Sequence, residues 1–186
     1  MELISKIIEI VIEIDNNIHQ AILKMHRPWL TKSMTILTHL GSSTVWYILY
    51  AIFFIFIKSG MDITLLTNGM GGLLLVLLFA ELFGLLIIIC LRHLTKRERP
   101  SKDLAVRIMD PWNRYSFPSL HSTRAFMIAT VIGVACPEWW GYMMSIAIMT
   151  GFSRLYLEKH YLSDVLTGAF VGICSALISL SFFNSF

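Results

Sequence analysis

The sequence predicts an all-α fold, a polytopic bundle of five or six transmembrane helices with an amphipathic helix at its N-terminus. Of the 186 residues, 56% are hydrophobic and only 15% are charged, whereas roughly a quarter of the residues of a soluble protein are charged. Several long stretches carry almost no charge. In lipid such stretches must form helices, because every backbone N–H and C=O group needs an internal partner.

The first 40 residues are predicted to form helices at the membrane surface. Residues 3–14 repeat apolar side chains at helical spacing but include Lys6, Glu9 and Glu13. This pattern fits an interfacial amphipathic helix and a membrane span equally well. Residues 24–40 are expected to form an interfacial or half-inserted helix. A cleavable signal peptide is not expected, because the basic leader and the small-residue cleavage site are missing.

Five firmer spans are predicted in the catalytic part of this single domain, residues 41–186. They cover approximately residues 42–58, 71–92, 119–136, 139–155 and 161–183. Counting the spans places the polar segments 92–118 and 154–164 on the same side of the membrane. Glu81 is charged and lies inside the second span, about three turns from Arg92. It is predicted to make a structural hydrogen bond or to be a neutral carboxyl.

Three groups of polar residues meet at this shared face. They are Arg92-x6-Arg99-Pro100, Pro118-Ser119-Leu120-His121 and Ser153-Arg154-x5-His160-x3-Asp164. Separately, they are explained as head-group contacts, a helix cap and an exposed pair on one helix face. Together, they provide guanidinium groups that match phosphate oxygens and two histidines with an aspartate one turn away. They also provide a helix start whose N–H groups at residues 119–121 are predicted to point outward.

These motifs resemble the signature of the type 2 phosphatidic acid phosphatase family, Lys-x6-Arg-Pro, Pro-Ser-Gly-His and Ser-Arg-x5-His-x3-Asp. The resemblance covers about residues 40–183, and the third motif matches fully. The family includes membrane lipid phosphatases and, on a related helical scaffold, soluble acid phosphatases and vanadium haloperoxidases. Arg92 replaces the family's lysine and keeps its charge. Leu120 replaces a glycine that lets the backbone approach the phosphate closely.

The resemblance implies hydrolysis of a phosphomonoester or diphosphate of a membrane lipid. His160 is then the nucleophile that forms a phosphohistidine, Asp164 orients it, and His121 protonates the leaving oxygen. The groups that hold the phosphate oxygens are Arg92, Arg99, Ser119, Arg154 and the N–H groups of Leu120 and His121. No metal or other cofactor is expected, because the arginines supply the positive charge and the sequence contains no HExxH motif and no Cys/His cluster.

The expected partners are the membrane and a lipid phosphate, and no nucleic acid. The candidate substrates are undecaprenyl diphosphate, the 1-phosphate of lipid A, phosphatidylglycerol phosphate and phosphatidic acid, with a slight preference for the first two. The resemblance implies a bacterial inner membrane and an active site that faces the periplasm, whereas the basic residues at this face favour the cytoplasm by the positive-inside rule. The basic residues outside the motifs are interpreted as head-group contacts: Lys96, Arg97, Lys102, Arg107 and Arg114.

Three other functions are considered. The phosphohistidine could pass its phosphate to an acceptor lipid, which would make the protein a phosphotransferase. A non-catalytic lipid-binding role is suggested by the bulk of Leu120. An intramembrane serine protease would use Ser153, but the sequence Gly151-Phe-Ser153-Arg154 lacks the glycine expected after such a serine, and the arginines would have no role in peptide chemistry.

Overall fold

A computed structural model describes residues 2–58, 71–101 and 115–184, and over these ranges the chain is all-α apart from one isolated bridge between Glu98 and Tyr115. The α-helices are α1 (Glu2–Leu23), α2 (Pro28–Thr38), α3 (Ser43–Lys58), α4 (Gly71–Thr95), α6 (Leu120–Ala135), α7 (Trp140–Tyr156) and α8 (Leu162–Asn184). Short 3-10 turns, His39–Gly41 and Pro137–Trp139, precede α3 and α7.

Each of the five predicted spans is a helix. The largest difference in a boundary is at the end of α4, which continues to Thr95. Among the residues that the structure describes, only α4 and α8 are both long and apolar enough to be clear membrane spans by composition, over Gly72–Thr95 and Leu162–Phe183. The apolar helices Ser43–Ile52 and Leu120–Ala135 are shorter. The number of five or six spans therefore stays a prediction, while the helical fold is confirmed.

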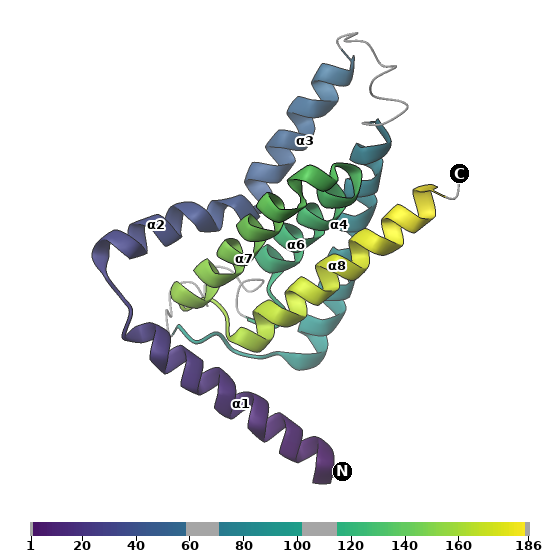
Figure 1. Ribbon diagram of the computed structural model, residues 1–186. Helices are drawn as coiled ribbons and strands as arrows, with labels where there is room; N and C mark the ends of the chain where they lie inside the picture. The colour runs from purple at the N-terminus through teal and green to yellow at the C-terminus, as the bar shows by residue number, and fades with distance from the viewer. Residues whose placement is uncertain (1, 59–70, 102–114, 185–186) are drawn as a thin grey trace.

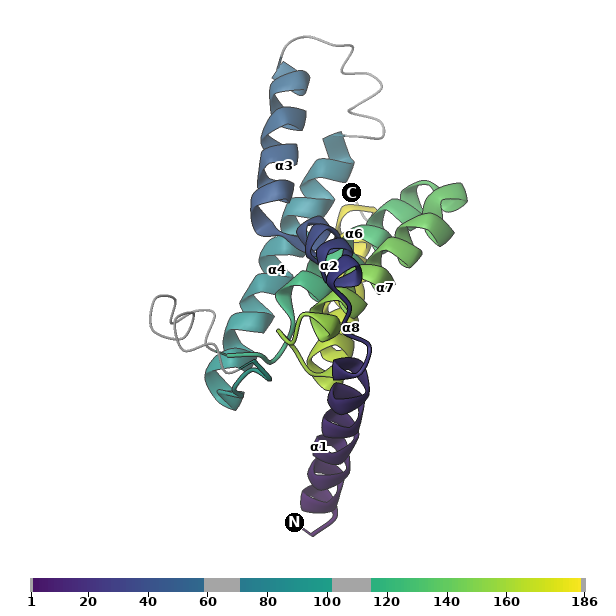
Figure 2. The ribbon, with the colours of Figure 1, turned by 90° about the vertical axis from the view of Figure 1, so that its left-hand side faces the viewer.

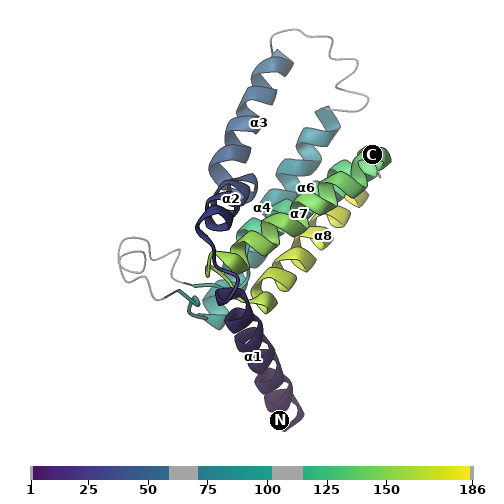
Figure 3. The same cartoon turned by 60° about the vertical axis from the view of Figure 1, so that its left-hand side comes forward.

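The helices bring the motif-bearing segments to one end of the bundle. The C-terminal ends of α4 and α7 and the N-terminal ends of α6 and α8 lie together at the lower end in Figures 1 and 3. The chain ends at the opposite end, where α3 also finishes. We call the lower end the polar end. The spatial arrangement agrees with the predicted meeting of the polar segments on one face.

Two glycines of α8 allow its backbone to approach α6. A Cβ atom built on Gly168 would lie 2.5 Å from the Ser119 carbonyl oxygen, and one on Gly172 would overlap the Thr123 carbonyl oxygen. Small residues spaced four apart on a helix commonly permit such close contact between membrane helices. The Gly168-x3-Gly172 pair therefore holds the first turns of α6 and α8 together at the polar end.

Replacing Gly172 with alanine is expected to lower the melting temperature in detergent. The added methyl group meets backbone rather than a flexible side chain, and overpacking of this kind costs about 1–3 kcal/mol. Gly141→Ala is the matched control, because no atom lies within 4 Å of a Cβ at that position of α7. Equal melting temperatures for the two variants would contradict the close packing of α6 and α8.

The N-terminal helix α1 is longer than the predicted segment 3–14 and has 22 residues. Figure 2 shows it extending from the polar end, with the N-terminus pointing away from the bundle. Its only buried residues are Asp15 and Ile22, and it exposes many apolar side chains. Tyr156 of α7 anchors the connection to α2, because its hydroxyl accepts a hydrogen bond from Arg27 N at 2.9 Å. The second half of α1 therefore lies against the bundle.

Candidate active site

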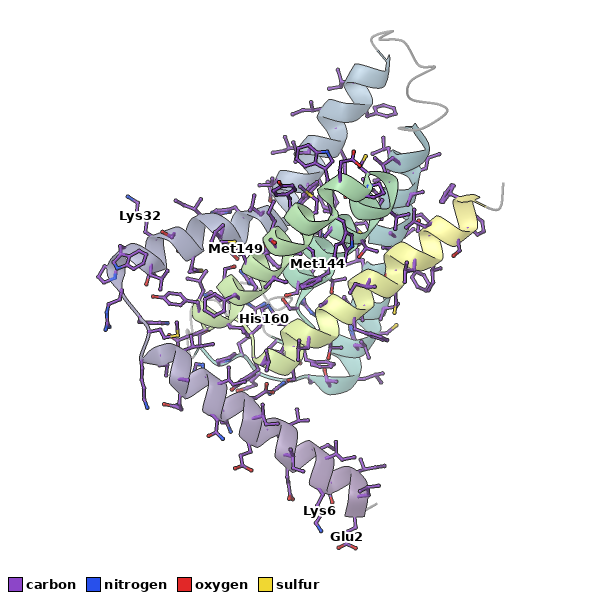
Figure 4. All side chains as sticks on the ribbon, viewed as in Figure 1. Glu2, Lys6, Lys32, Met144, Met149 and His160 are labelled. Atoms are coloured by element: carbon purple, nitrogen blue, oxygen red, sulfur yellow. The ribbon has the colours of Figure 1, made fainter. Side chains whose placement is uncertain are left out.

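His160 lies in the loop between α7 and α8 at the polar end, and only 3% of its surface is exposed (Figure 4). Burial lowers its pKa well below the usual value, and the positive charges of Arg154, Arg99 and Arg92 lower it further. A hydrogen bond with the backbone of Ser116 acts in the opposite direction but is the weakest of these effects. The imidazole is therefore neutral at neutral pH, which is the form that can act as a nucleophile.

Three arginines from two parts of the chain lie within electrostatic reach of His160. Arg92 lies in the last turn of α4, Arg99 follows α4, and Arg154 lies in the last turn of α7. Arg92 and Arg154 are 4% and 7% exposed. Arg92 Nη2 donates to the Pro118 carbonyl at 3.4 Å, and Arg154 Nη1 donates to Thr38 Oγ1 at 2.6 Å. Like charges gathered in a buried place repel one another, so binding of an anion between them would stabilise this arrangement.

Ser119 caps the N-terminus of α6, as predicted for a helix start at this motif. Its Oγ accepts hydrogen bonds from Ser122 N at 3.4 Å and Ser122 Oγ at 3.0 Å. The prediction that the N–H of residue 119 points outward is wrong, because Ser119 N donates to the Asp164 carbonyl at 3.0 Å. The N–H groups of Leu120 and His121 belong to the first turn, where a helix has no internal acceptors for them.

His121 lies in the first turn of α6, within electrostatic reach of His160 and Arg154. The two motif histidines therefore share one site, although 38 residues, 122–159, lie between them in the sequence. Gly41 packs against the backbone of His121, because a Cβ atom at Gly41 would lie 2.9 Å from the His121 carbonyl oxygen. This close contact fixes the backbone that carries His121.

Asp164 is fully buried in the first turn of α8, beside His160. Its Oδ2 lies 3.6 Å from His160 Nδ1, which is longer than a hydrogen bond. Oδ2 accepts a hydrogen bond from Tyr161 N at 2.9 Å, and Oδ1 accepts one from Arg97 Nη1 at 2.9 Å. The structure thus brings the predicted His–Asp pair together, with Arg97 as a further partner of the aspartate.

The sequence predicts a head-group contact for Arg97, but the structure places its guanidinium group between two carboxylates. Its guanidinium group donates to Asp164 through Nη1 and to Asp15 Oδ2 through Nη2, the latter at 2.7 Å. Lys96 is exposed, as a head-group contact requires. The other members of that set lie outside the described residues: Lys102, Arg107 and Arg114. Asp15 is visible in the sequence as an acid directly after the apolar segment 3–14, but no sequence pattern pairs it with Arg97.

Deep in the bundle, Glu81 makes the structural hydrogen bonds that were expected of it. Arg124 Nε lies 3.0 Å from each Glu81 carboxylate oxygen, and Arg124 Nη2 donates to Oε1. Arg124 Nη1 also donates to the Gly41 carbonyl at 3.0 Å. Both side chains are almost completely buried. No motif contains Arg124, so the sequence did not single it out as the partner of Glu81.

Two further observations concern the alternative chemistries. Ser153 is fully buried, and its Oγ donates to the Thr150 carbonyl of the preceding turn at 2.6 Å. Its hydroxyl therefore faces its own helix instead of a site for a peptide bond. Among the residues that the structure describes, no group of three or more His, Cys, Asp or Glu side chains is placed to hold a metal ion.

Comparisons with known proteins agree with this geometry. The model of the PAP2 superfamily matches residues 71–186. Phosphatidylglycerophosphatase B of Bacillus subtilis is 31% identical over 170 residues, which cover 86% of this chain and 78% of that protein. The crystal structure of Aquifex aeolicus LpxE has a TM-score of 0.70 at 27% identity and covers 89% of this chain and 93% of its own. The crystal structure of a transmembrane PAP2 type phosphatidylglycerolphosphate phosphatase from Bacillus subtilis has a TM-score of 0.72 at 25% identity. The match covers 92% of this chain and 85% of that one.

Proposed function

Because the chain belongs to the PAP2 superfamily, we propose that it is an integral membrane phosphatase that hydrolyses a phosphomonoester or diphosphate of a membrane lipid. The observation that carries the proposal is the placing of a buried, neutral His160 among the charges of three arginines. A neutral imidazole supplies the nucleophile, and guanidinium groups match the oxygens of a phosphate. The relatives named above include phosphatases of phosphatidylglycerol phosphate, a lipid phosphomonoester.

In the proposed first step, His160 attacks phosphorus and the bond to the leaving oxygen breaks. The phosphate oxygens are held by Arg92, Arg99, Arg154, the Ser119 hydroxyl and the N–H groups of Leu120 and His121. As the imidazole becomes a phosphohistidine it gains positive charge. The carboxylate of Asp164, 3.6 Å from Nδ1, then moves into hydrogen-bonding distance. Such contacts commonly tighten only when substrate is bound.

His121 is proposed to protonate the leaving oxygen and then to take a proton from the water that hydrolyses the phosphohistidine. His121→Asn is therefore expected to lower the turnover number by about 10²- to 10⁴-fold, the usual contribution of a general acid or base. Binding of orthovanadate, a phosphate analogue, should change little, because the arginines remain. An inhibition constant for vanadate that rises as much as turnover falls would place His121 in binding instead.

The substrate can be identified by assaying detergent-solubilised protein with a panel of lipids. Phosphate release is measured for undecaprenyl diphosphate, lipid A, phosphatidylglycerol phosphate and phosphatidic acid, with His160→Ala protein as the blank. Release from at least one lipid above the blank supports the proposed function. Phosphate transferred to an added acceptor lipid instead of water would identify a phosphotransferase, and no release from any lipid would favour the non-catalytic role.

The proposed location is a bacterial inner membrane, with the polar end facing the periplasm. The chain ends at the opposite end of the bundle (Figure 1), which this orientation puts in the cytoplasm. A reporter fused to the C-terminus should therefore be active only if it functions in the cytoplasm. Activity of a periplasm-specific reporter at this position would reverse the orientation.

A further inference from the structure

A chain of ion pairs and hydrogen bonds joins the N-terminal helix to the aspartate of the site. Arg97 Nη2 lies 2.7 Å from Asp15 Oδ2, and Arg97 Nη1 lies 2.9 Å from Asp164 Oδ1. Asp15 and Asp164 are 2% and 0% exposed. A single guanidinium group therefore lies between two buried carboxylates. Its planar fork can satisfy both at once, which the point charge of a lysine cannot do with the same geometry.

Ser163 completes this network from the start of α8. Its backbone N donates to Asp15 Oδ1 at 2.9 Å, and its hydroxyl donates to Asp15 Oδ2 at 2.6 Å. Arg97 Nη1 also donates to Ser163 Oγ at 2.6 Å. The Arg97 guanidinium lies over the ring of Tyr161, 4.2 Å from its centroid. Asp15 of α1 therefore accepts hydrogen bonds from Ser163, which precedes Asp164 in the chain, and from Arg97, which also donates to Asp164.

We propose that Arg97 and Asp15 are positioning residues of the active site, which set the orientation of Asp164 toward His160. This inference rests on the proposed phosphatase function and assigns a role to α1 within it. The two oxygens of Asp164 have different partners. Arg97 holds Oδ1, and this leaves Oδ2, with its bond from Tyr161 N, facing His160 Nδ1. Without Arg97 the carboxylate loses its ion pair at Oδ1, and the remaining hydrogen bonds, from Tyr161 N and the Ser116 side chain, hold its rotation less firmly.

The dependence on α1 follows from the burial of Asp15. A carboxylate removed from water is costly unless it is paired and hydrogen-bonded. Asp15 obtains its partners only where α1 lies against Arg97 and Ser163. Conversely, Arg97 is held over Asp164 by Asp15 on its other side. The position of α1 against the bundle and the orientation of Asp164 toward His160 are therefore coupled through Arg97.

The test measures single turnovers, in which the rate constant does not depend on the fraction of active protein. Purified protein in excess is mixed with dioctanoyl phosphatidic acid, or with the lipid of the panel that wild-type protein hydrolyses fastest, and phosphate release is followed by rapid quench. Arg97→Met is expected to lower the rate constant about tenfold or more, by analogy with other groups that orient a directly acting residue. Arg97→Lys should recover part of this loss. The orthovanadate inhibition constant should stay at the wild-type value.

Asp15→Asn preserves size and should lower the rate constant less than Arg97→Met. Because Asp15 acts through Arg97, the double variant should be no slower than Arg97→Met alone. Lys96→Met and Glu13→Gln are the matched controls, since each removes an exposed charge next to the network and should leave the rate constant unchanged. If Arg97→Met does not fold, Asp15→Asn and Arg97→Lys carry the same comparison.

A wild-type rate constant in Arg97→Met, or in both Asp15→Asn and Arg97→Lys where Arg97→Met does not fold, would overturn the positioning role and leave the proposed phosphatase intact. A loss of equal size in Lys96→Met would overturn it as well, because the effect would then follow from surface charge. If wild-type protein releases no phosphate from any lipid phosphate, the proposed function fails, and this inference fails with it.

Discussion

Replacing His160 with alanine is expected to abolish phosphate release from a lipid substrate, with a loss of at least about 10⁴-fold in turnover, as found when a nucleophile is removed from other hydrolases. The side chain is buried among Arg92, Arg99 and Arg154, so another nucleophile cannot take its place at the phosphorus. The measurement is phosphate release from the best lipid of the panel. The phosphate analogue orthovanadate should still bind, because the arginines are unchanged.

His93→Ala is the control for this experiment. His93 lies one residue after Arg92 in the last turn of α4, but its side chain is exposed, and its Nδ1 contacts the Ile89 carbonyl at 3.0 Å. Its removal should leave turnover near the wild-type value. A His160→Ala protein that releases phosphate at the wild-type rate would contradict the assignment of the nucleophile.

The second large effect is expected on stability, at the buried pair of Glu81 and Arg124. Glu81→Met leaves a buried guanidinium group that cannot lose its charge, and breaking a buried pair in this way costs about 3–5 kcal/mol. For a chain of this length, that corresponds to a fall of about 10 °C in melting temperature. Arg124→Met should cost less, because a buried carboxyl can become neutral by taking up a proton.

The Glu81→Met/Arg124→Met double variant provides the decisive comparison. With neither charge present, its melting temperature should return toward the wild-type value and lie above that of Glu81→Met. The temperatures are measured in one detergent, by loss of intrinsic fluorescence or by aggregation. If the two single effects simply add in the double variant, the pair does not act as a unit and the ion pair does not explain its burial.

The helices were largely predictable because lipid imposes one rule on every apolar stretch. A backbone without water must satisfy its own hydrogen bonds, so the stretches with little charge predict the positions of α3, α4, α6, α7 and α8. The C-terminal end of α1 was harder to predict from the sequence. Its last turns contain polar residues, and what keeps them helical against the bundle is the burial of Asp15 and Ile22, which no local pattern reveals.

The motif residues were also predictable as a group, because spacing and membrane topology together bring them to one end. Arg97, Asp15 and Arg124 were not. Arg97 lies in the basic segment between Arg92 and Arg99. In the sequence, an arginine that pairs with buried carboxylates there cannot be distinguished from one that contacts lipid head groups. Asp15 is 148 positions from Ser163, its hydrogen-bond partner. Partners of this kind depend on how helices rotate and pack, and a single sequence carries no direct signal of that.

The close packing of Gly168 and Gly172 against α6 has a consequence for how a lipid reaches the site. Where Gly168 and Gly172 approach the Ser119 and Thr123 carbonyl groups, no long side chain separates α8 from α6, so an acyl or prenyl chain has no path between the two helices there. Ser119 N, which donates to the Asp164 carbonyl at 3.0 Å, closes the polar end of the same seam. A lipid that enters the bundle sideways would therefore have to pass between other helices, and Ser119 at the start of α6 keeps a fixed position relative to Asp164 of α8.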